Sequence, residues 1–131
     1  MKIANKKVTA EMLVRDALEK AKHFADYNIF TFINENIDNQ QLSITMVTDY
    51  FHISAPTLQK RIYFRMGKTF SSYVIDMRMQ KAQQMLHNTS LSVQEIAQAV
   101  GYSNANSFYK AYKRHYGEAP TSTKQNNGGL S

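Results

Sequence analysis

The stretch LSVQEIAQAVGYS at residues 91–103 decides the fold, because the chain carries a second version of it. Residues 42–54, LSITMVTDYFHIS, match it 49 positions earlier, with the same first two residues, the same last residue and apolar residues at four further shared positions. After one extra residue the correspondence continues 50 positions apart, and each copy finishes at a glycine, Gly67 or Gly117. Such self-similarity indicates a supersecondary unit that is present twice.

Each copy predicts a short helix, a tight turn and a longer helix. Ser43 and Ser92 open the short helices, where a hydroxyl can accept hydrogen bonds from first-turn amides. The turns are expected at residues 52–53 and 101–102. A second pair of serines, Ser54 and Ser103, is expected to cap the longer helices, and the closing glycines suit helix ends. The pattern therefore predicts helix-turn-helix units at 42–67 and 91–117.

The longer helices each carry an apolar stripe beside a polar outward face. The stripes are Ala55, Leu58, Ile62 and Met66 in the first copy, and Ala105, Phe108, Ala111 and Tyr112 in the second. The outward faces are Pro56, Gln59, Lys60 and Tyr63, and Asn106, Tyr109, Lys110 and Lys113. Amide side chains can pair with adenine, and lysine can reach guanine, in the major groove of DNA. Both faces are therefore candidates for recognising base edges.

Positive charge gathers around these two helices. The 131 residues carry a formal net charge of +6, with 16 Lys and Arg against 10 Asp and Glu. Residues 1–40 are balanced, with six of each sign, whereas residues 54–124 hold ten basic and three acidic side chains. Basic side chains beside a recognition helix suit contacts with DNA phosphates. The candidates are Arg61, Arg65, Lys68, Lys113 and Arg114.

The regions outside the two units also predict helices. Residues 70–87 predict one linker helix of about 27 Å, which suits recognition helices in successive major grooves roughly 34 Å apart. Residues 9–25 predict an amphipathic helix and residues 29–37 a second short one, whereas residues 125–131 are expected to be disordered.

The predicted fold class is all-α: two helix-turn-helix subdomains joined by a long linker helix, about seven helices, plus an extra N-terminal helix. The linker's apolar residues, available to pack on both units, are Phe70, Tyr73, Val74, Met77, Ala82, Met85 and Leu86.

Composition argues against several other classes of protein. The chain has no cysteine, which excludes disulfides, thiolate metal sites and a cysteine nucleophile and favours the reducing cytoplasm. No run of 18 apolar residues predicts a membrane span. We expect no enzyme, cofactor or metal, because no nucleophile elbow or phosphate loop occurs and ligand-like spacing is absent from His23, His52, His87 and His115. For Arg78 we expect an ion pair with Asp76 or Glu95.

A set of short motifs extends over residues 28–122. They include LSI at 42–44, FHIS at 51–54, RMQKA at 78–82 and, above all, IAQAVGY at 96–102 leading to GEAP at 117–120. Together they resemble the AraC/XylS DNA-binding domain. The resemblance implies a bipartite fold and a transcription regulator, which we expect to be a cytoplasmic, monomeric activator that contacts double-stranded DNA and RNA polymerase. The expected domains are a helical extension at 1–27, the DNA-binding domain at 28–124 and the tail at 125–131.

The family pattern also implies which residues touch DNA. Base contacts would come from Pro56, Gln59, Lys60, Asn106, Tyr109 and Lys110. Phosphate contacts would come from helix N-termini near Ser43, Thr69 and Ser92, and from the basic side chains Arg61, Arg65, Lys68, Lys113 and Arg114. The sequence departs from the pattern at Thr48, where alanine is usual, at Ala119, where a hydroxyl is common, and at Thr121, where an aromatic is usual.

Three functional hypotheses follow from these observations. The first is a compact, sequence-specific regulator of double-stranded DNA. The second is a protein-interaction module that keeps the fold but docks to a polymerase or another regulator, and its binding would survive high salt. The third is a DNA-binding fragment of a longer sensor-regulator, since residues 1–27 are too few to enclose a ligand.

Overall fold

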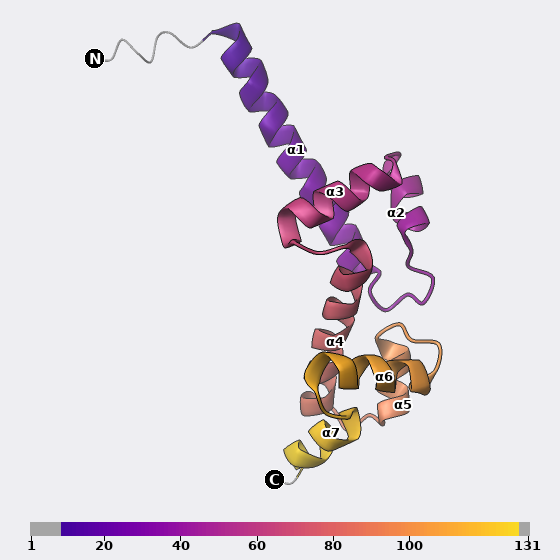
Figure 1. Cartoon of the computed structure of the whole chain (residues 1–131). Coiled ribbons are helices and arrows are strands. Elements are labelled where there is room, and N and C mark those ends of the chain that lie inside the picture. Colours follow the sequence, from indigo (N-terminus) through magenta and orange to yellow (C-terminus); the bar gives the residue numbers. More distant parts are fainter. Residues whose placement is uncertain (1–8, 129–131) are drawn as a thin grey trace, which may run out of the picture. The chain divides into compact units, whose positions relative to one another are not determined.

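A computed structural model describes residues 9–128 of the chain, which form seven helices and no strand within that range (Figure 1). The all-α class with two helix-turn-helix units and a linker helix is confirmed. The chain divides after Thr31 into two units. The helices are α1 (Ala10–Glu35), α2 (Ile44–Phe51), α3 (Ala55–Met66), α4 (Phe70–Asn88), α5 (Val93–Ala99), α6 (Ala105–Tyr116) and α7 (Pro120–Gly128).

The first unit consists, in its described part, of most of α1. The hydroxyl of Thr9 accepts a hydrogen bond from the amide of Met12 at 3.2 Å and so caps the start of this helix. The helix then runs for 26 residues without interruption, so the two helices predicted at 9–25 and 29–37 are one. No glycine or proline occurs between Ala10 and Glu35, and the polar residues near Asp26 shift the apolar pattern without breaking the backbone.

The second unit contains both helix-turn-helix pairs, and their equivalent positions fold alike. Recognition helices α3 and α6 each have 12 residues. Each ends at a glycine in the left-handed conformation, with φ of 69° at Gly67 and 79° at Gly117. Ser43 and Ser92 cap α2 and α5 as predicted. The doubled sequence unit is therefore a doubled structural unit.

The cap of α6 differs from the prediction. Ser54 caps α3, but its counterpart on α6 is Asn104, whose side chain accepts a hydrogen bond from the amide of Ser107 at 2.8 Å. The predicted cap, Ser103, lies one residue too early. The extra residue of the second copy falls before the cap, so Asn104 takes the place of Ser54 50 positions on. Asparagine satisfies first-turn amides as well as serine does.

The two turns also differ in which residue type adopts a positive φ. His52 has φ of 56°, the one positive value at a non-glycine among the described residues, and Gly101, 49 positions later, has φ of 94°. Left-handed backbone is strained for residues with a side chain. At Gly101 space is lacking as well, since a Cβ there would lie 2.6 Å from the carbonyl oxygen of Ile37 and 2.9 Å from Arg78.

Helix α4 supports both pairs and runs between them in Figure 1. Thr69 caps it by accepting from the amide of Ser72 at 3.2 Å. The second pair packs on its later half around one buried cluster: Met79, Ala82, Leu86, Ile96, Ala97, Val100, Phe108 and Tyr112. The prediction included most of the α4 members but omitted Met79, and it included Met77 and Met85, which are only half-buried.

Arg78 ties this helix to the loop that precedes α2. Its Nε donates to the carbonyl oxygen of Ile37, and its terminal nitrogen donates to that of Asn39, both at 2.8 Å. The guanidinium also lies 5.6 Å from the ring centre of Tyr102, in the second turn. The expected ion pair with Asp76 or Glu95 is therefore wrong. Burial lowers the pKa of Arg78, and backbone carbonyls supply the hydrogen bonds that the half-buried cation needs.

Helix α7 closes the second pair. It begins at Pro120, and the buried hydroxyl of Tyr112 donates to the hydroxyl of Thr123 at 3.0 Å. It continues to Gly128 and so covers the first four positions of the tail expected to be disordered, of which 129–131 lie outside the described residues. Among residues 9–128, none of the helices combines the length and the hydrophobicity that a membrane span requires.

Candidate nucleic-acid interface

Helix α3 presents one polar face to solvent. Leu58 and Ile62 are buried on its inner side, which fixes the opposite side as the outward one. Pro56, Lys60 and Tyr63 on that outward side are exposed. The apolar stripe is shorter than predicted, because its two ends, Ala55 and Met66, are exposed as well.

Gln59 differs from its neighbours on this face. It is half-buried, and its Oε1 accepts a hydrogen bond from the backbone amide of Phe70 at 2.9 Å. That amide belongs to the first residue of α4 and has no partner within the helix. The acceptor that a bidentate contact with adenine requires is therefore engaged in the fold. This hydrogen bond places Gln59 at the joint between α3 and α4, and its contact with bases stays a prediction.

Helix α6 presents the equivalent face without such an exception. Phe108 and Tyr112 are buried on its inner side. Asn106, Tyr109 and Lys110 are exposed on the other. Lys110 lies 50 positions after Lys60, so the two exposed lysines occupy the same place in the two recognition helices.

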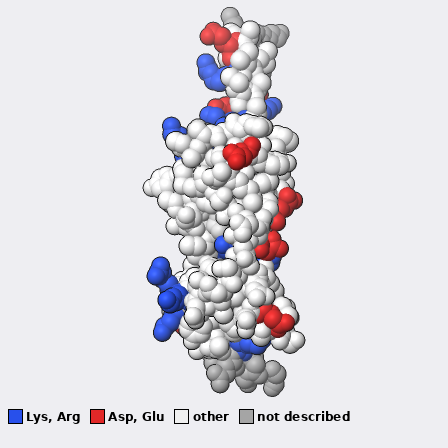
Figure 2. Space-filling model, turned by 90° about the vertical axis from the view of Figure 1, so that its right-hand side faces the viewer, with Lys and Arg blue, Asp and Glu red and all other residues white. Residues whose placement is uncertain are grey.

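Both recognition helices are basic. Each contains three Lys or Arg residues and no Asp or Glu. On the face drawn in Figure 2, basic side chains gather at one edge at the height of α6 in Figure 1, whereas acidic side chains follow the opposite edge. Arg61 is half-buried, and the remaining five are exposed: Lys60, Arg65, Lys110, Lys113 and Arg114.

The three predicted helix N-termini are not equal as anion sites. Ser43, Thr69 and Ser92 each cap a helix. At α5 the carboxylate of Glu95 also accepts from the amide of Ser92 at 2.9 Å, forming a capping box. This hydrogen bond lowers the pKa of Glu95, so a negative charge already stands there. The first turns of α2 and α4 hold no acidic residue, which leaves them better suited to an external phosphate.

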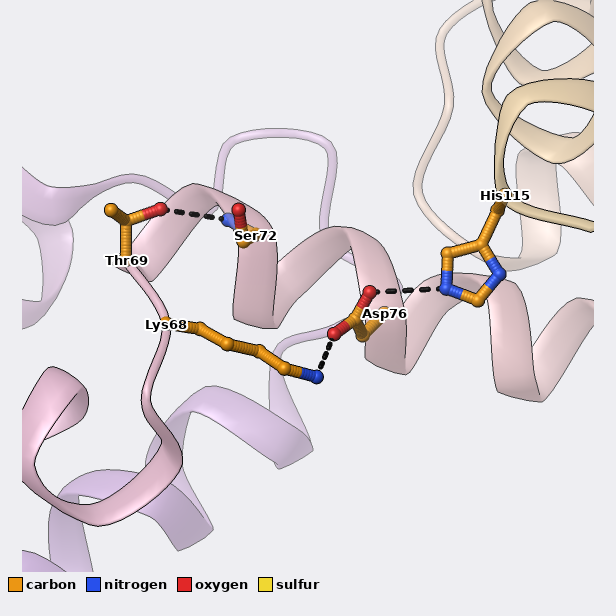
Figure 3. A network of polar contacts seen from close by, with 5 residues as sticks. All are labelled: Lys68, Thr69, Ser72, Asp76 and His115. Carbon is orange, nitrogen blue, oxygen red and sulfur yellow. Dashed lines mark hydrogen bonds and ion pairs between the residues drawn. The ribbon is translucent and has the colours of Figure 1, made fainter.

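Lys68 belongs to a polar network between three elements (Figure 3). Its Nζ contacts Oδ2 of Asp76 on α4, and Oδ1 of the same carboxylate lies 3.0 Å from Nε2 of His115 on α6. Partial burial raises the pKa of Asp76, but hydrogen bonds and positive charge from Lys68 and His115 outweigh burial and lower it overall. No local pattern predicts this contact, because 39 residues separate Asp76 from His115 along the chain.

Comparison with known proteins settles what kind of domain this is. Residues 47–126 match a family model described as a helix-turn-helix domain. The chain belongs to the AraC/XylS-type helix-turn-helix family. This is a family of DNA-binding transcription regulators. The resemblance noted in the sequence motifs is thereby confirmed.

Similar proteins include regulators and a solved domain. The chain is 32% identical over 88 residues to the HTH-type transcriptional regulator YfiF of Bacillus subtilis, covering 67% of this chain and 27% of that protein. It is 32% identical over 79 residues to the xylose operon regulatory protein of Escherichia coli, covering 60% and 20%. The C-terminal domain of AraT, a response regulator from Geobacillus stearothermophilus, has a TM-score of 0.75 at 26% identity and covers 77% and 84%. The chain thus spans less than a third of the curated relatives' length.

The departures from the AraC/XylS pattern can be located in the fold. Thr48 is half-buried on α2, and its hydroxyl donates to the carbonyl oxygen of Thr45 at 3.2 Å, so its polar group is satisfied locally. Thr121 is exposed where the family pattern has an aromatic residue. Helix α7 forms nevertheless, because Pro120 and Thr123 supply its buried contacts. Among residues 9–128 no cluster of potential metal ligands is found.

Proposed function

We propose that this chain binds double-stranded DNA at specific sequences and regulates transcription by placing α3 and α6 in successive major grooves. One observation carries the proposal: a basic helix of 12 residues occurs twice, and both copies are docked on one linker helix. The 19 residues of α4 extend over about 28 Å. Major grooves on one side of B-DNA recur at roughly 34 Å. A linker helix of this length therefore suits two recognition helices in successive grooves.

Five exposed side chains are proposed to recognise bases: Pro56, Lys60, Asn106, Tyr109 and Lys110. Lysine can donate to O6 and N7 of guanine, and an asparagine amide can both donate to and accept from adenine. Tyr109 offers a hydroxyl and a ring edge to the groove. The matched positions of Lys60 and Lys110 support a site made of two parts, one for each helix.

Phosphate contacts are proposed to flank these bases. The candidates are the helix starts at Ser43, Thr69 and Ser92 and the basic side chains Arg61, Arg65, Lys113 and Arg114. Among the three starts, we expect Ser43 and Thr69 to contribute more than Ser92, because Glu95 places a carboxylate beside Ser92. Such contacts fix register on the duplex and weaken as salt rises.

Lysine substitutions test base recognition directly. Lys60→Ala and Lys110→Ala are each expected to cost about 1–3 kcal/mol of binding free energy on the preferred site, with a smaller loss on unrelated duplex. Lys81→Ala is the matched control, because Lys81 is exposed on α4 outside both recognition helices. Equal losses on both duplexes would show that Lys60 and Lys110 hold phosphates, and specific recognition by these residues would be wrong.

We further propose that the protein is a monomeric transcription activator without enzymatic activity. It is proposed to work in the cytoplasm and to contact RNA polymerase. The polymerase contact is supported by Phe64 in the C-terminal half of α3, whose side chain is 86% exposed. Aromatic side chains contribute much of the energy of protein–protein interfaces, so an exposed phenylalanine suits contact with another protein. Phe64→Ser should weaken binding to polymerase and leave DNA affinity unchanged in a gel-shift titration.

The protein-interaction hypothesis is favoured by the same exposed Phe64. Under that hypothesis the chain would hold a protein partner at high salt, and the double variant Lys60→Ala, Lys110→Ala would bind this partner as well as the wild type does. Under the DNA hypothesis the double variant loses most of its affinity for the preferred DNA site.

A further inference from the structure

Asp76 is the one acidic residue of α4, and both of its oxygens are engaged. Oδ2 contacts Nζ of Lys68, and Oδ1 lies 3.0 Å from Nε2 of His115. Figure 3 shows Asp76 between these two partners, which approach it from opposite sides. The carboxylate therefore joins three elements of the second unit: the α3–α4 connection, α4 and α6.

The two partners are attached close to the ends of the recognition helices. Lys68 directly follows Gly67, the glycine that ends α3. His115 lies in the last turn of α6. A shift of the C-terminal end of either recognition helix would displace Lys68 or His115 from Asp76. Asp76 is thus placed to sense and to restrain both helices at once.

The environment makes these contacts stronger than those of an open surface pair. The side chain of Asp76 is 20% exposed, that of His115 29% and that of Lys68 45%. Partial desolvation strengthens electrostatic attraction, and one carboxylate that holds two partners forms a network rather than an isolated pair. Nε2 of His115 can donate to Asp76 both in the neutral tautomer that carries the proton there and as imidazolium. The ring of Tyr116 packs 4.5 Å from that of His115 and limits its movement.

We propose that Asp76 is a positioning residue that fixes α3 and α6 relative to each other, and that the protein consequently prefers one spacing between its two half-sites on DNA. The second clause rests on the proposed function. In this proposal the ammonium group of Lys68 contacts Asp76 and does not contact a DNA phosphate. Substituting Lys68 should therefore leave the salt dependence of DNA binding nearly unchanged, whereas substituting Lys113 should reduce its slope by about one.

A distance measurement in the free protein tests the positioning. The chain has no cysteine, so Asp49→Cys and Gln98→Cys place two nitroxide labels at exposed, equivalent positions of α2 and α5. Double electron–electron resonance then gives the distribution of the distance between the labels. We expect a narrow distribution in the labelled parent and a broader one when Asp76→Asn is added. Glu35→Gln, an exposed carboxylate outside the network, is the control and should leave the distribution narrow.

Lys68→Met and His115→Asn each remove one side of the network and should broaden the distribution as well. Thermal unfolding of every variant identifies any that fails to fold, and the label distances of the folded variants are compared with those of the labelled parent. An unchanged distribution in folded Asp76→Asn would overturn the proposal, whatever the protein does with DNA.

Binding to duplexes with altered half-site spacing tests the consequence. The wild type should prefer one spacing, and Asp76→Asn should lose much of that preference. Base changes within either half-site should still weaken DNA binding by Asp76→Asn as they weaken binding by the wild type. A preference that is unchanged in Asp76→Asn would contradict the role in spacing. If the wild type selects no sequence at all, the proposed function fails, and the label distances still decide the positioning role separately.

Discussion

The side-chain oxygen of Gln59 accepts a hydrogen bond from the backbone amide of Phe70 at 2.9 Å. Gln59 lies on the first recognition helix and Phe70 begins the linker helix, so this contact joins the helix that would enter DNA to the helix that supports it. The first amides of a helix lack internal partners. The contact therefore stabilises the start of α4 and holds α3 against it.

Replacing Gln59 by alanine should reduce the free energy of unfolding by about 1–2 kcal/mol, comparable with the loss of a helix cap. DNA affinity should fall by the same factor on preferred and unrelated duplexes. Urea unfolding gives the first quantity and gel-shift titration the second. Gln59→Glu retains an acceptor near a helix N-terminus and should keep its stability. A selective loss on sites that contain one particular adenine would instead show that Gln59 recognises a base.

The two turns predict opposite responses to substitution. His52→Gly should raise the free energy of unfolding by about 0.5–1 kcal/mol, because glycine relieves the left-handed strain but is more flexible when unfolded. Gly101→Ala should lower it by about 2 kcal/mol or more, because both φ and the nearby carbonyl of Ile37 oppose a Cβ. Chemical denaturation compares both variants with the wild type. Equal and small effects would mean that the turns tolerate either residue.

Arg78 should not be replaceable by lysine. Its forked guanidinium donates to two carbonyl oxygens, those of Ile37 and Asn39, and one ammonium group is expected to satisfy only one of them well. We expect Arg78→Lys to lose about 1–2 kcal/mol of unfolding free energy. Lys81→Arg, an exchange on the exposed side of the same helix, is the reverse control and should be near neutral. A neutral Arg78→Lys variant would show that the carbonyl contacts add nothing to stability.

The lowered pKa of Asp76 predicts a stability difference that depends on pH. A carboxyl group whose folded pKa lies below its unfolded value stabilises the fold above the unfolded value, about 3.9 for Asp. This stabilisation is lost as pH falls through the lowered, folded value. The wild type should therefore exceed Asp76→Asn in unfolding free energy at pH 6, and the difference should shrink below about pH 4. Urea titrations at several pH values measure it, and a constant difference would contradict a charge-based role.

Much of the fold was predictable from local patterns. Caps, helix-ending glycines and apolar stripes act over a few residues, so the doubled unit is visible in the sequence itself. Errors arose where a local pattern was ambiguous by one residue, as with Ser103 and Asn104. They also arose near Asp26, where a change in apolar phase within a continuous helix resembled a break.

The candidate site was less predictable because helical periodicity gives a side chain's direction but not its partners. Gln59, Lys68 and Arg78 all lie where the pattern suggests solvent or a nearby ion pair. Each is instead engaged with a group 8 to 41 residues away. Such partners depend on how helices pack, and the sequence contains no local signal for them. Exposed positions such as Lys60 and Lys110 have no tertiary partner to foresee, which is why their predicted exposure agrees with the structure.

Selection from a random duplex library with the purified chain near physiological salt tests the central claim most directly. The bound fraction is sequenced, and Lys60→Ala, Lys110→Ala is selected in parallel. We expect two enriched blocks about one helical turn apart in the wild type, and loss of both blocks in the double variant. An absence of enrichment, with binding that simply collapses as salt rises, would contradict sequence-specific recognition by the two helices.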